Sequence, residues 1–378
     1  MKTNNLVTWI AFSMALIAPD VFAQQSGVTI YGAIDTMVRH TDNEITNGTV
    51  GDKTKMEEGV LQGPRLGFKG QEDLGSGTSA VFQLEMGFGA NDGVADQQGQ
   101  LFGRQAFIGL KNTSLGEIDA GRQYGVALDT MANYDPLGMG NLPENAWQLY
   151  LVGIRFDNSL KYTNTWGPFN AELQYSFGGQ AGSTSLGSTR GFALGYSNAP
   201  FNIGTFVQQS IDANANKVTI AGLGTKLTLE QTSLFLNYFN AKRDAGFATA
   251  VSNSGGALAN TSQLNNVGNS LQRMDEVVTV GAVYQAAPNM AYTLGYMADS
   301  VKNESSAGNS GKIATVYAVA DYSLSKRTGI YFDVDYTKVR GGEIDNGQFT
   351  NTVMQFVGAG LGGATSRTGI AVGFRTKF

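Results

Sequence analysis

The feature that most constrains this chain is an alternation of apolar and polar residues that recurs from residue 28 to the end of the sequence. A period of two is typical of strands, because successive side chains point to opposite faces of a sheet. Bounded by turn residues, the pattern predicts sixteen strands. They cover residues 28–40, 62–70, 79–89, 102–112, 116–124, 153–164, 170–178, 191–199, 201–210, 217–228, 232–243, 276–287, 290–300, 312–325, 328–340 and 365–378.

The connections between these strands alternate in length. Short ones such as "TSLG", "LEQ" and "SKR" are followed by long ones, which cover 41–61, 90–101, 125–152, 179–190, 211–216, 244–275, 301–311 and 341–364. Short turns at one rim and long loops at the other are typical of an up-and-down transmembrane barrel. The fold class that we predict is therefore all-β, a 16-stranded antiparallel barrel with both chain ends at the short-turn rim.

The two faces of the predicted strands fit lipid outside and water inside. On 328–340, Ile330, Phe332 and Val334 alternate with residues that include Asp333 and Asp335. A carboxylate that faced hydrocarbon would cost several kcal/mol, so the two aspartates belong in the lumen. No stretch after residue 23 is apolar for 18 residues, and the sequence therefore predicts no membrane-spanning helix.

Residues 1–23 have the pattern of a cleaved signal peptide. Lys2 precedes an apolar run over residues 6–18, and Val21 and Ala23 occupy the −3 and −1 positions of a cleavage site. We expect export, with residues 24–378 as a single barrel domain.

Composition narrows the function classes. The 50 glycines and 15 tyrosines favour sheet and turns over helix, and the absence of cysteine excludes disulfides and thiol chemistry. The net charge of −5 gives no basic footprint for nucleic acid. His40 is the only histidine, so a histidine-based hydrolase is disfavoured, and we expect no cofactor, no metal site and no enzyme.

Two of the predicted strands place polar or charged side chains on the face that should contact lipid. If Arg104 points inward, Gln105 and Lys111 point outward. Either strands 102–112 and 116–124 face another subunit, or the assumed register is wrong; we favour the subunit contact.

Several segments resemble the general porins of Gram-negative outer membranes, most closely the β-proteobacterial type. The segments are "VTIYGAID", "GPRLGFKGQEDLGSG", "FGRQAFIGL", "GEIDAGRQYG", "DNSLKYTN" and the terminal "GFRTKF". The resemblance implies an outer-membrane location, a homotrimer in contact with lipid, and a third loop folded into the lumen as a constriction.

The resemblance also implies the residues of that constriction. The wall arginines of the family match Arg65, Arg104 and Arg155, to which the inward parity of Arg39 and the spacing of Lys69 add two more cations. The third loop begins at Tyr124, which we include in the constriction, and its acidic position matches Asp135. Met139 stands where the family often has a glutamate; Asp129 and Glu144 are candidate substitutes.

This set of residues predicts a passive diffusion channel for ions and small hydrophilic solutes. Four arginines against one matched acid indicate a weak preference for anions, since rings of charge select the sign of the permeating ion. A substrate-specific channel on the same fold is the main alternative, and an outer-membrane enzyme or an adhesin without a pore is a distant one.

The last strand predicts the closure of the barrel. Ile370, Val372, Phe374 and Phe378 form the apolar face, and Arg375 and Lys377 fall between them. The strand must pair with 28–40, because an open edge in lipid leaves backbone groups unsatisfied. The resemblance implies that Phe378 also acts as a signal for the outer-membrane assembly machinery.

Overall fold

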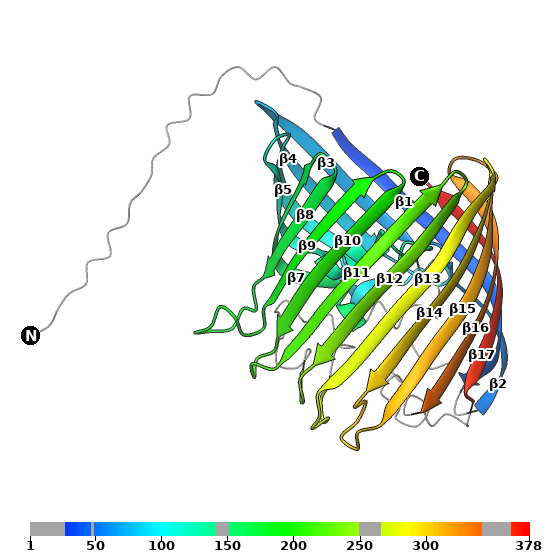
Figure 1. Cartoon of the computed structure of the whole chain (residues 1–378). Helices are drawn as coiled ribbons and strands as arrows, with labels where there is room; N and C mark the ends of the chain where they lie inside the picture. Colours follow the sequence, from blue (N-terminus) through cyan, green and yellow to red (C-terminus); the bar gives the residue numbers. More distant parts are fainter. Residues whose placement is uncertain (1–26, 47–48, 141–150, 249–265, 342–363) are drawn as a thin grey trace, which may run out of the picture.

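The computed structural model describes residues 27–46, 49–140, 151–248, 266–341 and 364–378 (Figure 1). The predicted signal peptide and Glu144 lie outside these residues. The strands are β1 (Gly27–Thr46), β2 (Thr49–Glu58), β3 (Arg65–Gly75), β4 (Thr78–Gly87), β5 (Gln105–Asn112), β6 (Gly116–Tyr124), β7 (Arg155–Trp166), β8 (Phe169–Ser176), β9 (Thr189–Asn198), β10 (Phe201–Ile211), β11 (Lys217–Leu229), β12 (Thr232–Arg243), β13 (Arg273–Ala287), β14 (Met290–Lys302), β15 (Ser310–Ser323), β16 (Thr328–Gly341) and β17 (Ser366–Lys377). Two short helices, α1 (Asp96–Gly99) and α2 (Val126–Ala132), complete the described elements.

The strands form a closed antiparallel barrel. From β3 to β17 each strand pairs with the next, and β1 pairs with β17 from Ala33 opposite Lys377 to Thr41 opposite Gly369. Closure removes the sheet edge that lipid could not satisfy. Figure 1 shows the start of β1 and the end of β17 at the same rim, as the even strand number predicts.

Seventeen strand segments occupy sixteen positions in the wall. One edge of β1 pairs with β3 over its first residues, from Gly27 to Ala33, and with β2 farther on, from Thr36 to Thr46. The 16-stranded prediction is confirmed, but the prediction of a loop over 41–61 is wrong for most of that stretch. The hairpin was missed because β2, "TVGDKTKMEE", has no regular apolar face to mark it.

The segment between β2 and β3 bulges out of the ladder. Ala33 lies opposite Arg65 and Thr36 opposite Glu58, so two residues of β1 face the six residues 59–64. Asp35 holds this bulge: its backbone oxygen accepts from the Gly59 N–H at 2.9 Å and its carboxylate from the Gln62 N–H at 2.9 Å.

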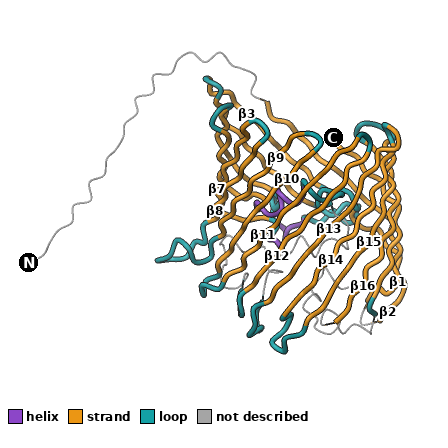
Figure 2. Tube along the Cα trace, viewed as in Figure 1, coloured by secondary structure: helices purple, strands orange, loops and turns teal. Residues whose placement is uncertain are grey.

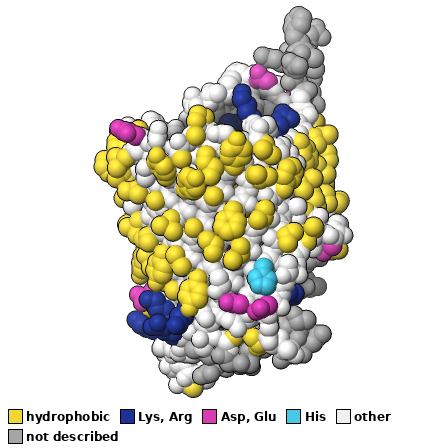
Figure 3. Space-filling model, turned by 90° about the vertical axis from the view of Figure 1, so that its right-hand side faces the viewer, with side chains coloured by type: hydrophobic (Ala, Val, Ile, Leu, Met, Phe, Trp, Pro, Cys, Tyr) yellow, Lys and Arg dark blue, Asp and Glu magenta, His cyan; other side chains and the backbone are white. Residues whose placement is uncertain are grey.

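The outer face is an apolar belt. Figure 3 shows hydrophobic side chains across the middle of the barrel and charged side chains toward its ends. On β16, Phe332 is 47% exposed whereas Asp333 and Asp335 are buried on the inner side, which confirms the predicted alternation of faces.

The register that we assumed for β5 is wrong. Gln105 lies opposite Glu85, whose side chain contacts the inward Tyr31, so Gln105 faces the lumen. Arg104 precedes the strand and is outside its alternation. The outer face carries Ile108 and Leu110, both exposed, and thus gives no argument for a subunit contact.

The third loop enters the ring of strands. Figure 2 shows the short helices inside the barrel, and the first residues of α2 meet its inner wall. The Val126 N–H donates to Gln174 of β8 at 3.2 Å and the Ala127 N–H to Gln208 of β10 at 3.3 Å. A side chain at Gly191 would place its Cβ 2.2 Å from Val126, so the bare backbone of β9 makes room for the helix. Neither described helix is long and apolar enough to cross a membrane.

Candidate pore constriction

Two arginines converge on one tyrosine at the mouth of the third loop. Arg104 Nη2 donates to the Tyr124 hydroxyl at 2.8 Å, and Arg155 Nη2 donates to the same oxygen at 3.2 Å. Arg104 also forms an ion pair with Glu85 of β4, with 2.6 Å between Nε and Oε1. We call Glu85, Arg104, Tyr124 and Arg155 the Tyr124 cluster.

The Tyr124 cluster contains more positive than negative charge. Its two guanidinium groups remain protonated at any physiological pH, and Glu85 is its one carboxylate. The Arg155 guanidinium lies 4.7 Å from the centroid of the Tyr124 ring, where the face of the ring attracts a cation. The tyrosine therefore holds two like charges close together by its hydroxyl and by its ring.

Contacts extend from Glu85 along the wall to β1 and β3. The Tyr31 hydroxyl donates to Glu85 Oε2 at 2.9 Å, and Lys69 Nζ lies 5.4 Å from the Tyr31 ring. Arg65, opposite Ala33 in the ladder, shares the inner face with Tyr31 and has no ion pair among the described residues. Four of the predicted cations lie on one side of the wall: Arg65 and Lys69 on β3, Arg104 directly before β5, and Arg155 at the start of β7.

Two carboxylates that interact with the arginines of the Tyr124 cluster were not predicted. Besides Glu85, Asp96 of α1 interacts electrostatically with Arg104 and Arg155. Burial raises the pKa of the Asp96 carboxyl, while Arg104 opposes this shift. The inward parity of strand 79–89 could have identified Glu85, but no signal in the sequence places the second long loop beside the arginines.

The side chain of Arg39 in β1 is directed toward β17 and β16, away from β3. Its Nη2 forms a buried ion pair with Asp335 of β16 at 2.6 Å. A Cβ at Gly369 would lie 2.0 Å from this nitrogen, so the glycine leaves the space that the guanidinium needs. Arg39 thus forms its ion pair with β16 and not with a member of the Tyr124 cluster.

Asp129 and Asp135, the acids of the third loop that the structure describes, have other partners than the residues of the Tyr124 cluster. Asp135 is buried, and its Oδ1 accepts from the N–H groups of Leu137 at 2.9 Å and Met139 at 3.0 Å. Burial raises the pKa of Asp135 to about 6, although these two hydrogen bonds oppose the shift. Asp129 pairs instead with Lys161 of β7, which also lies 3.5 Å from Glu172.

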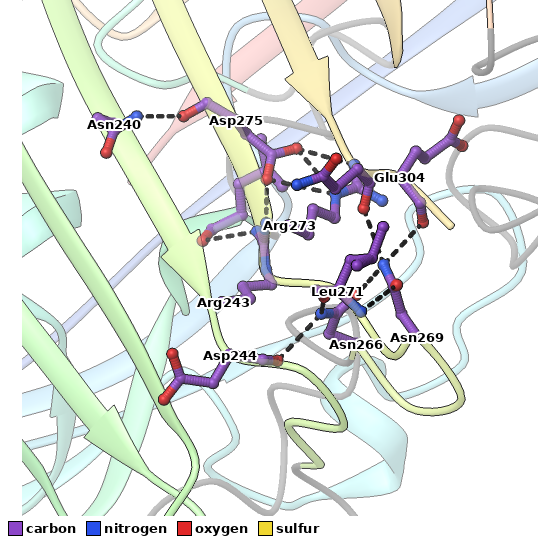
Figure 4. A network of polar contacts seen from close by, with 11 residues as sticks. Asn240, Arg243, Asp244, Asn266, Asn269, Leu271, Arg273, Asp275 and Glu304 are labelled. Carbon is purple, nitrogen blue, oxygen red and sulfur yellow. Dashed lines mark hydrogen bonds and ion pairs between the residues drawn. The ribbon is translucent and has the colours of Figure 1, made fainter. Parts of the chain in front are cut away.

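A second group of arginines lies on the wall around β1 and β12–β17. Asp275 of β13 pairs with both Arg243 and Arg273 (Figure 4). Arg367 of β17 pairs with Glu44 of β1 at 2.6 Å. All of these side chains are at least nine-tenths buried. We call this group, together with Arg39 and Asp335, the ion-pair wall.

The fold and the charged lumen define the class of protein. A closed barrel with an apolar belt, an inward loop and charges on its inner wall is a transmembrane channel. Residues 11–342 match the Gram-negative porin family. The chain therefore belongs to this family and is an outer-membrane channel.

Relatives agree with this assignment. An outer membrane porin protein of Bordetella pertussis is 29% identical over 350 residues, which cover 83% of this chain and 89% of that protein. The solved anion-selective porin from Comamonas acidovorans has a TM-score of 0.72 at 21% identity and covers 94% of this chain and 100% of its own. A trimer form of OmpT from Vibrio cholerae has a TM-score of 0.63 at 14% identity, covering 94% and 100%.

Proposed function

We propose that the chain is a passive diffusion channel for ions and small hydrophilic solutes, with a weak preference for anions. The observation that carries this proposal is the Tyr124 cluster, where Arg104 forms an ion pair with Glu85 while Arg155 donates to the Tyr124 hydroxyl. In a narrow lumen with low-dielectric walls, uncompensated charge concentrates counter-ions. The solved porin from Comamonas acidovorans, which has the same fold, is anion-selective.

The reversal potential in a potassium chloride gradient tests the sign of the selectivity. We expect a potential on the anion side for the wild type and a several-fold lower anion-to-cation permeability ratio for Arg155→Glu. Arg190→Glu, on the exposed outer side of β9, is the control and should leave the potential unchanged. A wild type that prefers cations would overturn the proposed selectivity, and an inert Arg155→Glu would remove Arg155 from the constriction.

We further propose that three copies assemble in the membrane, with lipid around them. The proposal rests on the family and on the trimeric OmpT structure. The outer face of β5 does not distinguish a subunit contact from a lipid contact, because an apolar face fits both. Cross-linking of the detergent-solubilised protein should give a species of three chains. A single-chain species alone would contradict it.

We also propose that Phe378, at the end of the C-terminal strand, acts as a signal for the outer-membrane assembly machinery. The Phe378 N–H donates to Gly32 O at 3.1 Å, and the Gly32 N–H returns a bond to Phe378 O at 3.0 Å. Deletion of Phe378 should lower the amount of inserted barrel more than the conductance of the molecules that insert. Normal insertion of the deletion variant would refute a role as an assembly signal.

N-terminal sequencing of the exported protein should begin at Gln24 if residues 1–23 are removed.

A further inference from the structure

A polar cavity lies between the third loop and the barrel wall, apart from the Tyr124 cluster. Its volume is about 260 Å³, and its lining comes from the loop after α2 and from the inner faces of β8–β11. Asn133 and Tyr134 line it from the loop, and Asn170, Glu172 and Asn202 from the wall. Concave sites where a few polar groups converge are the usual binding places for small molecules.

Two polar groups of the cavity have hydrogen-bonding capacity to spare. Among the described residues, neither the Asn170 amide nor the Tyr134 hydroxyl makes a side-chain hydrogen bond. An amide offers two donors and an acceptor, and a phenol offers one of each. A hydroxyl group of a solute could therefore bind as donor and as acceptor at the same place.

Two glycines give these side chains their positions. A Cβ at Gly204 would lie 2.6 Å from the Tyr134 hydroxyl oxygen, and a Cβ at Gly195 would lie 2.6 Å from Asn170 Oδ1. Any larger residue would push these groups out of the places that they occupy. The wall is thus shaped to hold the tyrosine and the asparagine against the cavity.

The charges of the lining favour a neutral ligand. Glu172 and Lys226 both line the cavity, so an anion would meet the carboxylate and a cation the ammonium group. Each charge also has an internal neighbour: Glu172 lies 3.5 Å from Lys161, and Lys226 Nζ lies 5.2 Å from the centroid of the Phe235 ring. Neutral amides and hydroxyls are left as the groups best able to bind a solute.

We infer that this cavity is a saturable binding site for neutral polyhydroxylated solutes of monosaccharide size, within the pore. The inference rests on the proposed channel function and adds a solute class to it. Binding has to be weak, because a solute that passes through a channel must also leave it. We expect half-saturation on the order of 1–10 mM, close to −4 kcal/mol or weaker.

Glucose titration of the open channel in a planar bilayer tests the inference. Glucose should lower the potassium chloride current along a saturating curve. Asn170→Leu, which removes the amide at similar volume, should raise the half-saturation concentration about tenfold, which corresponds to about 1.4 kcal/mol. Tyr134→Phe removes only the hydroxyl and should shift the curve in the same direction, so the test stands even if Asn170→Leu fails to insert.

Gln71→Leu is the matched control, because it removes another lumen amide, one that contacts Ser79 on a different wall. It should leave the glucose curve unchanged. A current that falls linearly with glucose, as viscosity alone requires, would overturn the inference, as would wild-type curves for both cavity variants. Saturation by glycine in place of glucose would overturn the neutral-solute assignment. Conductance without sugar, measured in the same traces, reports separately whether the protein is a channel.

Discussion

The Tyr124 cluster and the ion-pair wall use the same residue type in opposite ways. In the ion-pair wall, Arg39, Arg243, Arg273 and Arg367 each meet a buried carboxylate, and Asp275 serves two of them. In the Tyr124 cluster, Arg155 meets a phenol rather than a carboxylate. An arginine paired with a carboxylate stabilises the wall, and its charge is balanced there. An arginine that donates to a neutral group keeps an unbalanced positive charge, which acts on ions in the lumen.

A count of lumen arginines therefore does not measure selectivity. Arg39 and Arg155 both face inward, yet Asp335 balances the charge of Arg39 at 2.6 Å. Opposite charges at that distance act at long range as a dipole, and a dipole has little power to select the sign of an ion. The anion preference that we propose depends on the Tyr124 cluster and its neighbours Arg65 and Lys69.

The largest effect should come from breaking the ion-pair wall. Asp275→Asn leaves Arg243 and Arg273, 1% and 4% exposed, without their shared carboxylate. Removing one partner of a buried pair costs about 3–5 kcal/mol. The thermal unfolding midpoint of the barrel should therefore fall clearly.

Glu276→Gln is the matched control for Asp275→Asn. Its carboxylate is on the next residue of β13 and pairs with Lys302 at 3.5 Å on the exposed side. Its loss should cost no more than about 0.5 kcal/mol, as for exposed ion pairs. Equal midpoints for the two variants would remove the distinction between the buried wall and the surface.

Asp135 provides an intermediate case, since it is a buried carboxyl group to which the described structure assigns no cation. Its pKa of about 6 lies above the ordinary value of 3.8. The folded loop thus binds a proton more tightly than the unfolded chain, and its stability decreases as the pH rises from about 4 through about 6. The change is on the order of 1–3 kcal/mol.

Hydrogen exchange measures this pH dependence. Amides of residues 126–139 should be better protected at pH 5 than at pH 8, after correction for intrinsic exchange rates. Asp135→Asn should remove the difference. If the variant keeps the same pH dependence, another group is responsible for it.

The tyrosine itself is the next test of the comparison. Tyr124→Phe keeps the ring near Arg155 but removes the oxygen that accepts from both arginines. Hydrogen bonds to charged groups contribute about 1.5–3 kcal/mol each. Water in the lumen can replace the lost hydroxyl as an acceptor, so the net loss of stability is smaller than the sum of the two bonds. We expect the free energy of unfolding to fall by about 1–2 kcal/mol in denaturant titrations, less than for Asp275→Asn. Tyr292→Phe, on the exposed outer face of β14, should have no such effect.

The smallest effect should follow from Glu85→Gln. This change removes the one carboxylate of the Tyr124 cluster, and a unit charge about 10 Å from the ion path contributes about 0.4 kcal/mol in water. The anion-to-cation permeability ratio should rise about twofold, opposite to the effect of Arg155→Glu. Glu276→Gln, outside the lumen, should leave the ratio unchanged; a decrease with Glu85→Gln would show that Glu85 does not offset the arginines.

Most of the wall could be predicted from the sequence, and its exceptions have physical causes. Strands that cross lipid need an apolar face, and this requirement made β16 and β17 recognisable. The hairpin of β1 and β2 was missed where charged residues replace that face. The register of β5 was wrong because Arg104 lies just before the strand, where the alternation does not yet apply.

The sequence by itself determined the barrel, its strand number and the inward side of most charges, because a period of two assigns each side chain to a face. Only the tertiary structure decided which charges meet. Arg39 and Asp335 are 296 residues apart in the chain, and Arg104 reaches Tyr124 from a different segment of the wall. The pairing of β1 with β17 and the space left by Gly369 allow Arg39 to reach Asp335, and neither is encoded in the alternation of a single strand.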